Sequence, residues 1–106
     1  MSTGTGLEHP DIDEVDLGAV LLALADPHRR QVVLELARDP KTERQCATFV
    51  LPIAKSTKTH HWRVLRESGL VYQRAVGNGL YIRLRDDDLK RRFPGLLDTI
   101  AALDVP

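Results

Sequence analysis

One stretch, Lys55–Leu70, constrains the fold of this chain more than any other, because it predicts a helix with both ends encoded. A hydroxyl side chain at Ser56 or Thr57 predicts the N-cap, where such a group satisfies a free N–H of the first turn. Gly69 predicts the end of the helix, since glycine adopts the left-handed conformation at low cost. The stretch therefore predicts one uninterrupted helix.

The two faces of this predicted helix differ in character. Trp62 and Leu65 are three residues apart and Lys58 precedes Trp62 by four, so these side chains share one face. The other face carries hydrogen-bonding and cationic groups, namely Ser56, Thr59, His60, Arg63 and Arg66. Such a face fits the major groove of DNA, although a solvated surface helix has the same composition. His61 lies nearer to the Trp62 side, which favours a buried histidine over a metal ligand.

Charge is distributed unevenly along the chain, although the formal net charge is zero. Residues 1–26 contain six acidic residues and no Lys or Arg, whereas residues 55–85 contain seven Lys or Arg residues against the single acid Glu67. A local basic segment of this kind attracts phosphate groups even in a neutral chain. The charge pattern therefore favours the DNA interpretation of the helix.

Two helices are predicted before this stretch. Leucine and valine side chains recur at helical spacing over residues 14–25 and predict an apolar stripe there. Asp26 then predicts an N-cap, and Pro27 the first position of a helix over residues 27–37, where no N–H is required.

A third, short helix is predicted over residues 43–49 or 43–50. Thr42 and Gln45 have the spacing of a capping box, and Pro52 ends the segment. A short helix joined by a tight turn to the Lys55–Leu70 helix predicts a helix-turn-helix, whose second helix enters the DNA groove.

A β-hairpin is predicted directly after this unit. Apolar residues alternate with Tyr81, Arg83 and Arg85 over Leu80–Arg85, and the Gly77-Asn78-Gly79 sequence predicts the turn. The strand before the turn, within residues 70–76, is rich in β-formers, but its alternation is ambiguous. The predicted fold is therefore mainly α with a small β-hairpin, a winged helix-turn-helix.

The chain ends in further helix signals. Asp86–Asp88 can cap a helix over Leu89–Arg92, and Pro94 predicts the first residue of a final helix. The first and last helices both carry apolar stripes, which exceed what a small core can bury. A subunit interface and a core role are both open for these residues: Leu17, Val20, Leu21, Leu24, Leu96, Leu97, Ile100 and Leu103.

The remaining features of the sequence indicate where the domain lies and which classes of protein are excluded. Residues 1–12 are expected to form a flexible tail and residues 13–106 the domain. No apolar run is long enough to span a membrane, and the N-terminus shows no secretion signal, so a cytoplasmic protein is expected. The lone Cys46 suits a reducing compartment. There is no Gly-rich phosphate loop or nucleophile elbow, and we predict no enzymatic activity and no cofactor.

Two motifs resemble a known family. Ala23–Arg30 reads ALADPHRR, and Thr59–Val71 reads THHWRVLRESGLV. In this order and spacing they are similar to the helix junction and the recognition helix of the ArsR/SmtB family of winged helix-turn-helix repressors. The resemblance covers about residues 14–103.

The resemblance implies a homodimer through the first and last helices, binding to an imperfect palindrome in a promoter, and release when an effector arrives. It implies that several positions of the recognition helix and its preceding turn face DNA: Lys55, Ser56, Thr57, Thr59, His60 and Arg63. It further implies wing contacts from Arg74, Asn78 and Arg83. From the residues alone, Arg74, Tyr81 and Arg83 could hold phosphates or enter the minor groove, or could keep an exposed hairpin soluble.

The chain also departs from the metal-sensing members of that family. Such members carry paired cysteines in the third helix or Asp and His ligands on the last helix, whereas this chain has only Cys46 and no histidine in its last helix. Lys58 stands where the family usually has an apolar residue, so its stem is expected to pack while its ammonium reaches outward. Two alternatives remain open: a repressor responding to metal or redox change through Cys46 and histidines, and a winged-helix module for protein–protein binding. The sequence specifies no small-molecule effector.

Overall fold

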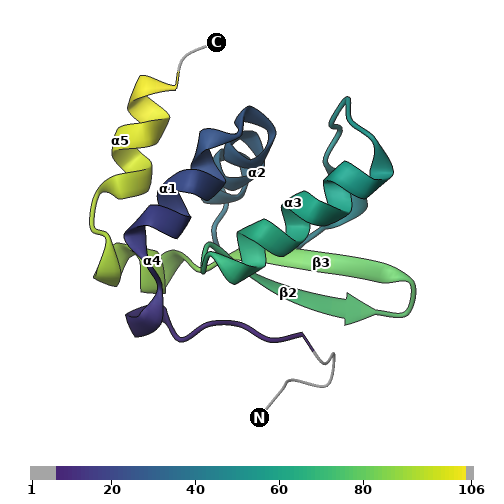
Figure 1. Ribbon diagram of the computed structural model, residues 1–106, viewed down its shortest axis with the longest axis horizontal. Helices are drawn as coiled ribbons and strands as arrows, with labels where there is room; N and C mark the ends of the chain where they lie inside the picture. The colour runs from purple at the N-terminus through teal and green to yellow at the C-terminus, as the bar shows by residue number, and fades with distance from the viewer. Residues whose placement is uncertain (1–6, 105–106) are drawn as a thin grey trace.

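The computed structural model describes residues 7–104 and has the winged helix-turn-helix architecture (Figure 1). Its elements are η1 (Ile12–Glu14), α1 (Leu17–Ala25), α2 (Pro27–Ala37), β1 (Arg44–Gln45), η2 (Cys46–Thr48), α3 (Lys55–Glu67), β2 (Val71–Val76), β3 (Gly79–Leu84), α4 (Asp86–Arg92) and α5 (Leu96–Leu103). The predicted fold class is therefore confirmed.

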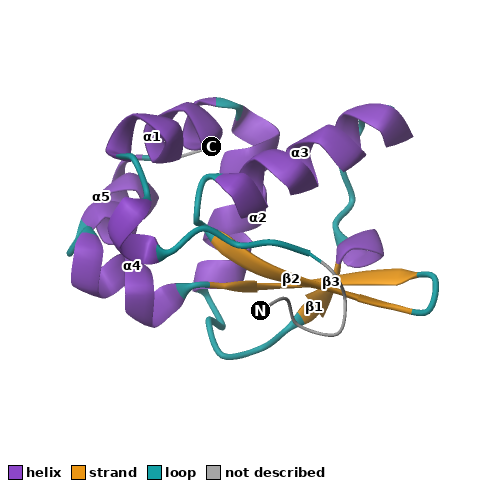
Figure 2. Ribbon diagram, turned by 60° about the horizontal axis from the view of Figure 1, so that its bottom comes forward, coloured by secondary structure: helices purple, strands orange, loops and turns teal. Residues whose placement is uncertain are grey.

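The sheet is antiparallel and has the strand order β1-β3-β2. The predicted hairpin forms its larger part, with Tyr72 opposite Arg83 and Gln73 opposite Ile82. Gly77 adopts a φ of 56° in the turn, as a tight hairpin turn requires. Figure 2 shows α1, α2 and α3 gathered on one side of the sheet, and that inward face supplies fully buried side chains such as Ile82.

The first two helices begin as their caps dictate. Asp16 accepts a hydrogen bond from the Ala19 N–H at 3.0 Å, so α1 begins at Leu17 and not at residue 14, because residues 12–14 form a separate 3₁₀ turn. Asp26 caps α2 by accepting from two N–H groups of its first turn, which confirms the predicted start at Pro27.

The predicted third helix over residues 43–50 is wrong. Its first half is the strand β1, whose Arg44 and Gln45 pair with β3, and only the 3₁₀ turn η2 follows. Thr42 does not form the expected capping box, because its hydroxyl donates to Asp39 at 2.6 Å. Sheet pairing therefore overrides the local helix signal, and the first helix of the helix-turn-helix is reduced to a single turn.

The helix α3 runs from Lys55 to Glu67 as one element, but its predicted N-cap is wrong. The N-cap is Ala54, which has no side chain to accept a hydrogen bond, so neither Ser56 nor Thr57 caps the helix. The predicted end is confirmed, because Gly69 has a φ of 87° and its Cα packs directly against Val15.

The C-terminal helices also differ from their predicted starts. The helix α4 begins at Asp86 and not at Leu89, with Arg85 as N-cap. Asp86–Asp88 therefore form the first turn of the helix and do not precede it. Pro94 is not the first residue of α5, since Gly95 with a φ of 80° turns the chain before Leu96.

The sequence predicted a flexible tail over residues 1–12. The described part of this tail, residues 7–12, is packed against the domain. The imidazole Nε2 of His9 accepts a hydrogen bond from the Gln73 N–H at 2.8 Å, along the open edge of β2. Arg85 donates to the Pro10 carbonyl at 2.8 Å. This segment therefore covers a strand edge, while the first six residues lie outside the described part of the chain.

Candidate nucleic-acid interface

The face of α3 that points away from the domain carries the residues predicted to contact DNA. Its opposite side is buried by His61, Trp62 and Leu65, which anchor the helix to the core. The six predicted DNA-facing residues of this helix are all exposed: Lys55, Ser56, Thr57, Thr59, His60 and Arg63. We call this set the α3 face. The structure therefore gathers it on one accessible surface.

The N-terminal end of α3 adds backbone donors to the α3 face. Because Ala54 provides no side-chain cap and the first turn contains no acidic residue, the N–H groups of that turn lack a capping carboxylate or hydroxyl. Lys55 stands beside them. A helix N-terminus of this kind, with its partial positive charge, is suited to hold a phosphate.

Lys58 lies between the two sides of α3. Its side chain is partly buried, and its ammonium lies 3.5 Å from the Phe49 carbonyl oxygen, in donor orientation. The stem packs as expected, but the expected outward reach of the ammonium is wrong, because the ammonium is directed to the Phe49 carbonyl in the loop before α3.

Arg66 is turned inward, although the sequence places it on the polar face. It donates to the Gln73 Oε1 at 3.1 Å, and Gln73 also donates to the Trp62 carbonyl. Gln73 is buried and links the hairpin to the recognition helix. The sequence analysis missed this residue because its role depends on contacts between two separate elements.

The hairpin presents its cations on the opposite face of the sheet from α3. Arg74 is exposed but forms a bidentate ion pair with Glu43, at 3.0 and 2.6 Å. The Arg74 side chain lowers the pKa of the Glu43 carboxyl through this hydrogen bond. Glu43 was not singled out from the sequence, because it is 31 residues from Arg74 and no local pattern marks the contact.

The other predicted wing residues are placed differently. The Arg83 guanidinium lies over the Tyr72 ring, 5.1 Å from its centre, and is half-buried. Asn78 is exposed at the hairpin turn. Figure 1 shows the hairpin and α3 projecting from the same side of the molecule, so the turn and the α3 face can meet one extended partner.

A cluster at the start of α2 contacts the buried side of α3. The ligating atoms of Asp26, His28 and His61 all lie within 4.8 Å of one another. His61 Nε2 is 3.6 Å from Asp26, and Arg29 Nη1 is 3.2 Å from His61 Nδ1. Because a guanidinium can only donate, His61 Nδ1 must accept, and the ring proton lies on Nε2 facing Asp26.

The position of this proton determines whether the cluster of Asp26, His28 and His61 can bind a metal. A metal at His61 Nε2 needs the lone pair that the proton occupies, and the Arg29 cation lies beside it. Arg29 is itself fixed by the Ala23 and Leu22 carbonyls at 2.8 and 3.1 Å. Burial lowers the pKa of His61, which Asp26 partly opposes. The residues therefore form a hydrogen-bonded clamp between α1, α2 and α3 and fit a metal poorly.

Cys46 is the first residue of η2 and is buried. Burial raises the pKa of its thiol to about 12, so the reactive thiolate is scarce near neutral pH. This environment argues against a redox response through Cys46.

The apolar stripes of α1 and α5 divide between the core and the surface. Val20 and Leu24 are buried inside the protomer, because they face α2 on the inner side of α1. Leu96, Leu97 and Ile100 pack partly against the core. Leu17, Leu21 and Leu103 are exposed, and so is Leu22, which the sequence analysis did not include.

Among residues 7–104, no helix is both long and apolar enough to cross a bilayer.

Comparison with known proteins supplies a second line of evidence. No family model matches the chain. The chain is 31% identical over 83 residues to the HTH-type transcriptional regulator YceK of Bacillus subtilis, covering 76% of this chain and 82% of that protein. It is 30% identical over 82 residues to the transcriptional repressor SmtB homolog of Synechocystis sp., covering 77% of this chain and 61% of the relative. The crystal structure of an ArsR family transcriptional regulator shares its fold, with a TM-score of 0.63 and 20% identity over 85% of this chain and 98% of that one.

Proposed function

Since the chain belongs to the ArsR/SmtB family of winged helix-turn-helix transcriptional regulators, we propose that it is a repressor that binds an imperfect palindrome in a promoter as a homodimer. The relatives are transcriptional regulators and not enzymes. The observation that carries the proposal is the α3 face, which offers two cations and four other polar side chains on one accessible surface.

The α3 face divides into positioning and reading groups. Lys55, Ser56 and Thr57 surround the uncapped N-terminus of α3 and would bind phosphates, which fixes the register of the protein on the duplex. Arg63 is about two turns further along, where its planar guanidinium would pair with the O6 and N7 atoms of guanine. Thr59 and His60 would contact base edges or phosphates between these two groups.

The wing would contribute less than the α3 face. Asn78 at the hairpin turn and Arg83 would reach the neighbouring backbone or minor groove. Arg74 would first have to leave Glu43 before it could bind a phosphate.

The dimer would form through the exposed apolar residues of α1 and α5. Leu17, Leu21 and Leu22 on α1 and Leu103 on α5 expose large apolar side chains that a second copy would cover. A dimer with two-fold symmetry would present two copies of the α3 face to the duplex, and a palindrome mirrors that symmetry. DNA binding places such a protein in the cytoplasm, with the nucleoid.

The alternative of a winged-helix protein-binding module is disfavoured by the α3 face. Such a module would present an apolar patch there, whereas every member of the α3 face is polar. A metal- or redox-dependent release through Cys46 and the histidines is disfavoured by the buried thiol and by the Arg29–His61 contact.

The test is selection of genomic duplex fragments by the purified protein, followed by anisotropy titration of the selected fragment at several salt concentrations. We expect one palindromic motif, two chains per duplex by light scattering, and an affinity that falls steeply with salt because several phosphates are neutralised. A salt-independent interaction, or equal affinity for the selected and a shuffled fragment, would contradict the proposal.

A further inference from the structure

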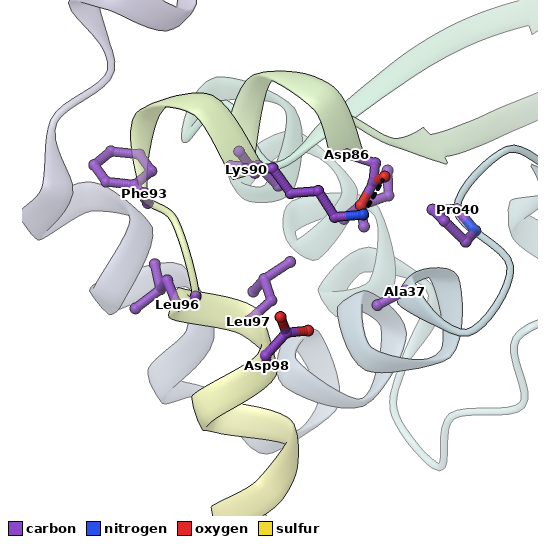
Figure 3. Close-up of a pocket in the computed structure, with 11 residues that line it drawn as sticks. Ala37, Pro40, Asp86, Lys90, Phe93, Leu96, Leu97 and Asp98 are labelled. Atoms are coloured by element: carbon purple, nitrogen blue, oxygen red, sulfur yellow. Dashed lines mark ion pairs between the residues drawn. The ribbon is translucent and has the colours of Figure 1, made fainter.

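A small cavity lies between α4 and the start of α5, on the side away from the α3 face. Figure 3 shows Leu96, Leu97 and Asp98 of α5 on one side, Lys90 of α4 and the following Phe93 on another, and Ala37 at the end of α2. Its volume is about 90 Å³. An apolar cavity of about 150 Å³ holds the six carbons of benzene, so this space suits a group of about four non-hydrogen atoms.

The cavity has apolar walls and an acidic mouth. The Lys90 ammonium lies 3.1 Å from Asp86 across the mouth, and the carboxylates of Asp86, Asp98 and Asp87 raise the pKa of Lys90. Lys90 is therefore engaged by acids and is a poor site for an anion. Asp98 is exposed and forms no ion pair within the described part of the chain. Charge at the mouth thus favours a cationic ligand.

The helix beside the cavity packs on the domain through its first turn, where Leu96 and Leu97 contact the core. Arg30 Nε donates to Asp104 at 2.9 Å just after the C-terminal end of α5. None of the residues of α5 is fully buried, and the left-handed Gly95 joins it to α4. A ligand between α4 and α5 would therefore act on the turn through which α5 packs on the domain.

We propose that this cavity is a binding site for a small branched aliphatic amine, whose alkyl group fills the apolar space and whose ammonium pairs with Asp98. Leu97 and Phe93 supply apolar contact, and the Asp86–Lys90 pair forms the far side of the mouth. A role of this ligand as an effector rests on the proposed function, because it requires that α5 belong to the dimer that binds DNA.

The test uses three probes of one shape and different charge: isopentylamine, isopentanol and isovalerate. Each is titrated into the uniformly ¹⁵N-labelled protein, and amide shifts are followed by NMR. We expect shifts at residues of α4 and α5 around the cavity, with the amine binding about two- to fivefold more tightly than the alcohol, the range of an exposed ion pair. Isovalerate is expected to bind more weakly than the alcohol.

Two variants and a matched control separate the apolar and the charged contribution. Asp98→Asn removes the amine's advantage and leaves alcohol binding unchanged, whereas Glu67→Gln, which removes an exposed acid of α3 outside the cavity, leaves the advantage intact. Ala37→Leu fills the cavity and abolishes binding of all probes. No shifts at any probe concentration up to ~50 mM, well above the weak affinity that so few atoms can give, would overturn the site, as would equal binding of the three probes.

The effector role is tested separately with the selected operator fragment. Isopentylamine is expected to change the DNA affinity of the unchanged protein and of Glu67→Gln, but not of Asp98→Asn. Amine binding by NMR without any change in DNA affinity would remove the effector role. If no duplex is bound at all, the proposed function fails, whereas the NMR titration still decides whether the cavity binds amines.

Discussion

The α3 face and the outer face of the hairpin are both basic, yet they hold their cations in different ways. Lys55 and Arg63 on α3 are exposed and take part in no ion pair within residues 7–104. On the hairpin, Arg74 is paired with Glu43 and Arg83 is stacked over Tyr72. One surface is thus ready to bind phosphates, whereas the other must first exchange its internal partners.

This difference assigns unequal roles to the two surfaces. An exchange of Arg74 from Glu43 to a phosphate replaces one charge-assisted contact by another, so its net contribution is small. Binding of Arg63 to a base edge replaces only water. The α3 face should therefore dominate affinity and specificity, while the hairpin adjusts them.

The largest expected effect on DNA binding comes from Arg63. We expect Arg63→Ala to weaken operator binding by about 1–3 kcal/mol and to relax discrimination at one base pair, because a bidentate base contact is lost. The loss of operator affinity caused by Arg74→Ala is expected to be several-fold smaller than the loss caused by Arg63→Ala. Both affinities are measured by anisotropy with the operator and with base-substituted duplexes.

The control for this comparison is Arg38→Ala, which removes an exposed arginine at the end of α2, away from both surfaces. It should leave operator affinity unchanged, and all three variants should retain the melting temperature of the unchanged protein. If Arg74→Ala costs as much affinity as Arg63→Ala, the distinction between the two surfaces is wrong.

The next effect concerns the link between the two surfaces. Gln73→Ala removes the side chain that holds Arg66 and the Trp62 carbonyl, leaving buried polar groups of α3 without a partner. We expect the free energy of unfolding to fall by ~1–2 kcal/mol, as such unpaired groups cost. Urea unfolding measures this loss. Gln73→Glu, which keeps the acceptor for Arg66 but not the donor, should recover part of it; no loss in either variant would show that the hairpin and α3 are held together by apolar packing alone.

The sequence predicted the α3 face well because its information is local. Apolar and polar side chains at three- and four-residue spacing placed Trp62 and Leu65 inward and Arg63 outward, and Gly69 marked the end. The N-cap was wrong, because Ala54 precedes the helix, and Arg66 was misplaced, because its inward turn depends on Gln73 of another element.

The hairpin was less predictable because its electrostatics depend on distant contacts. Its turn and alternating strand follow from Asn78 and its neighbours, but the pairing of Arg74 with Glu43 follows only from the strand β1. The capping-box pattern at Thr42 predicted a helix in that place, since sequence spacing does not show that Arg44 and Gln45 can pair with β3. The cluster of His28 with His61 was missed for the same reason.

A smaller effect is expected when the internal partner of Arg74 is removed. Glu43→Gln breaks the ion pair and leaves Arg74 available for a phosphate, so operator affinity should rise by about two- to fivefold. The salt dependence should steepen by about one phosphate contact per protomer. Glu67→Gln, an exposed acid near the C-terminal end of α3, provides the matched charge control. If both variants raise affinity equally, the gain reflects general charge and not release of Arg74.

The smallest expected effect is the pH dependence that His9 confers through the edge of β2. Burial, followed by the Arg85 and Arg66 cations, lowers the pKa of His9 below 6.5. The unfolded chain therefore takes up the proton first as pH falls, so the free energy of unfolding decreases from pH 6.5 down to the folded-state pKa and then levels off. His61, whose pKa is also lowered, adds to the same trend.

His9→Gln keeps an acceptor near the Gln73 N–H at every pH, so urea unfolding between pH ~8 and ~5 should show a shallower but not absent pH dependence. If the unchanged protein and His9→Gln have identical pH profiles, release of the N-terminal segment from β2 does not alter the free energy of unfolding. The edge of β2 would then be energetically independent of the rest of the domain.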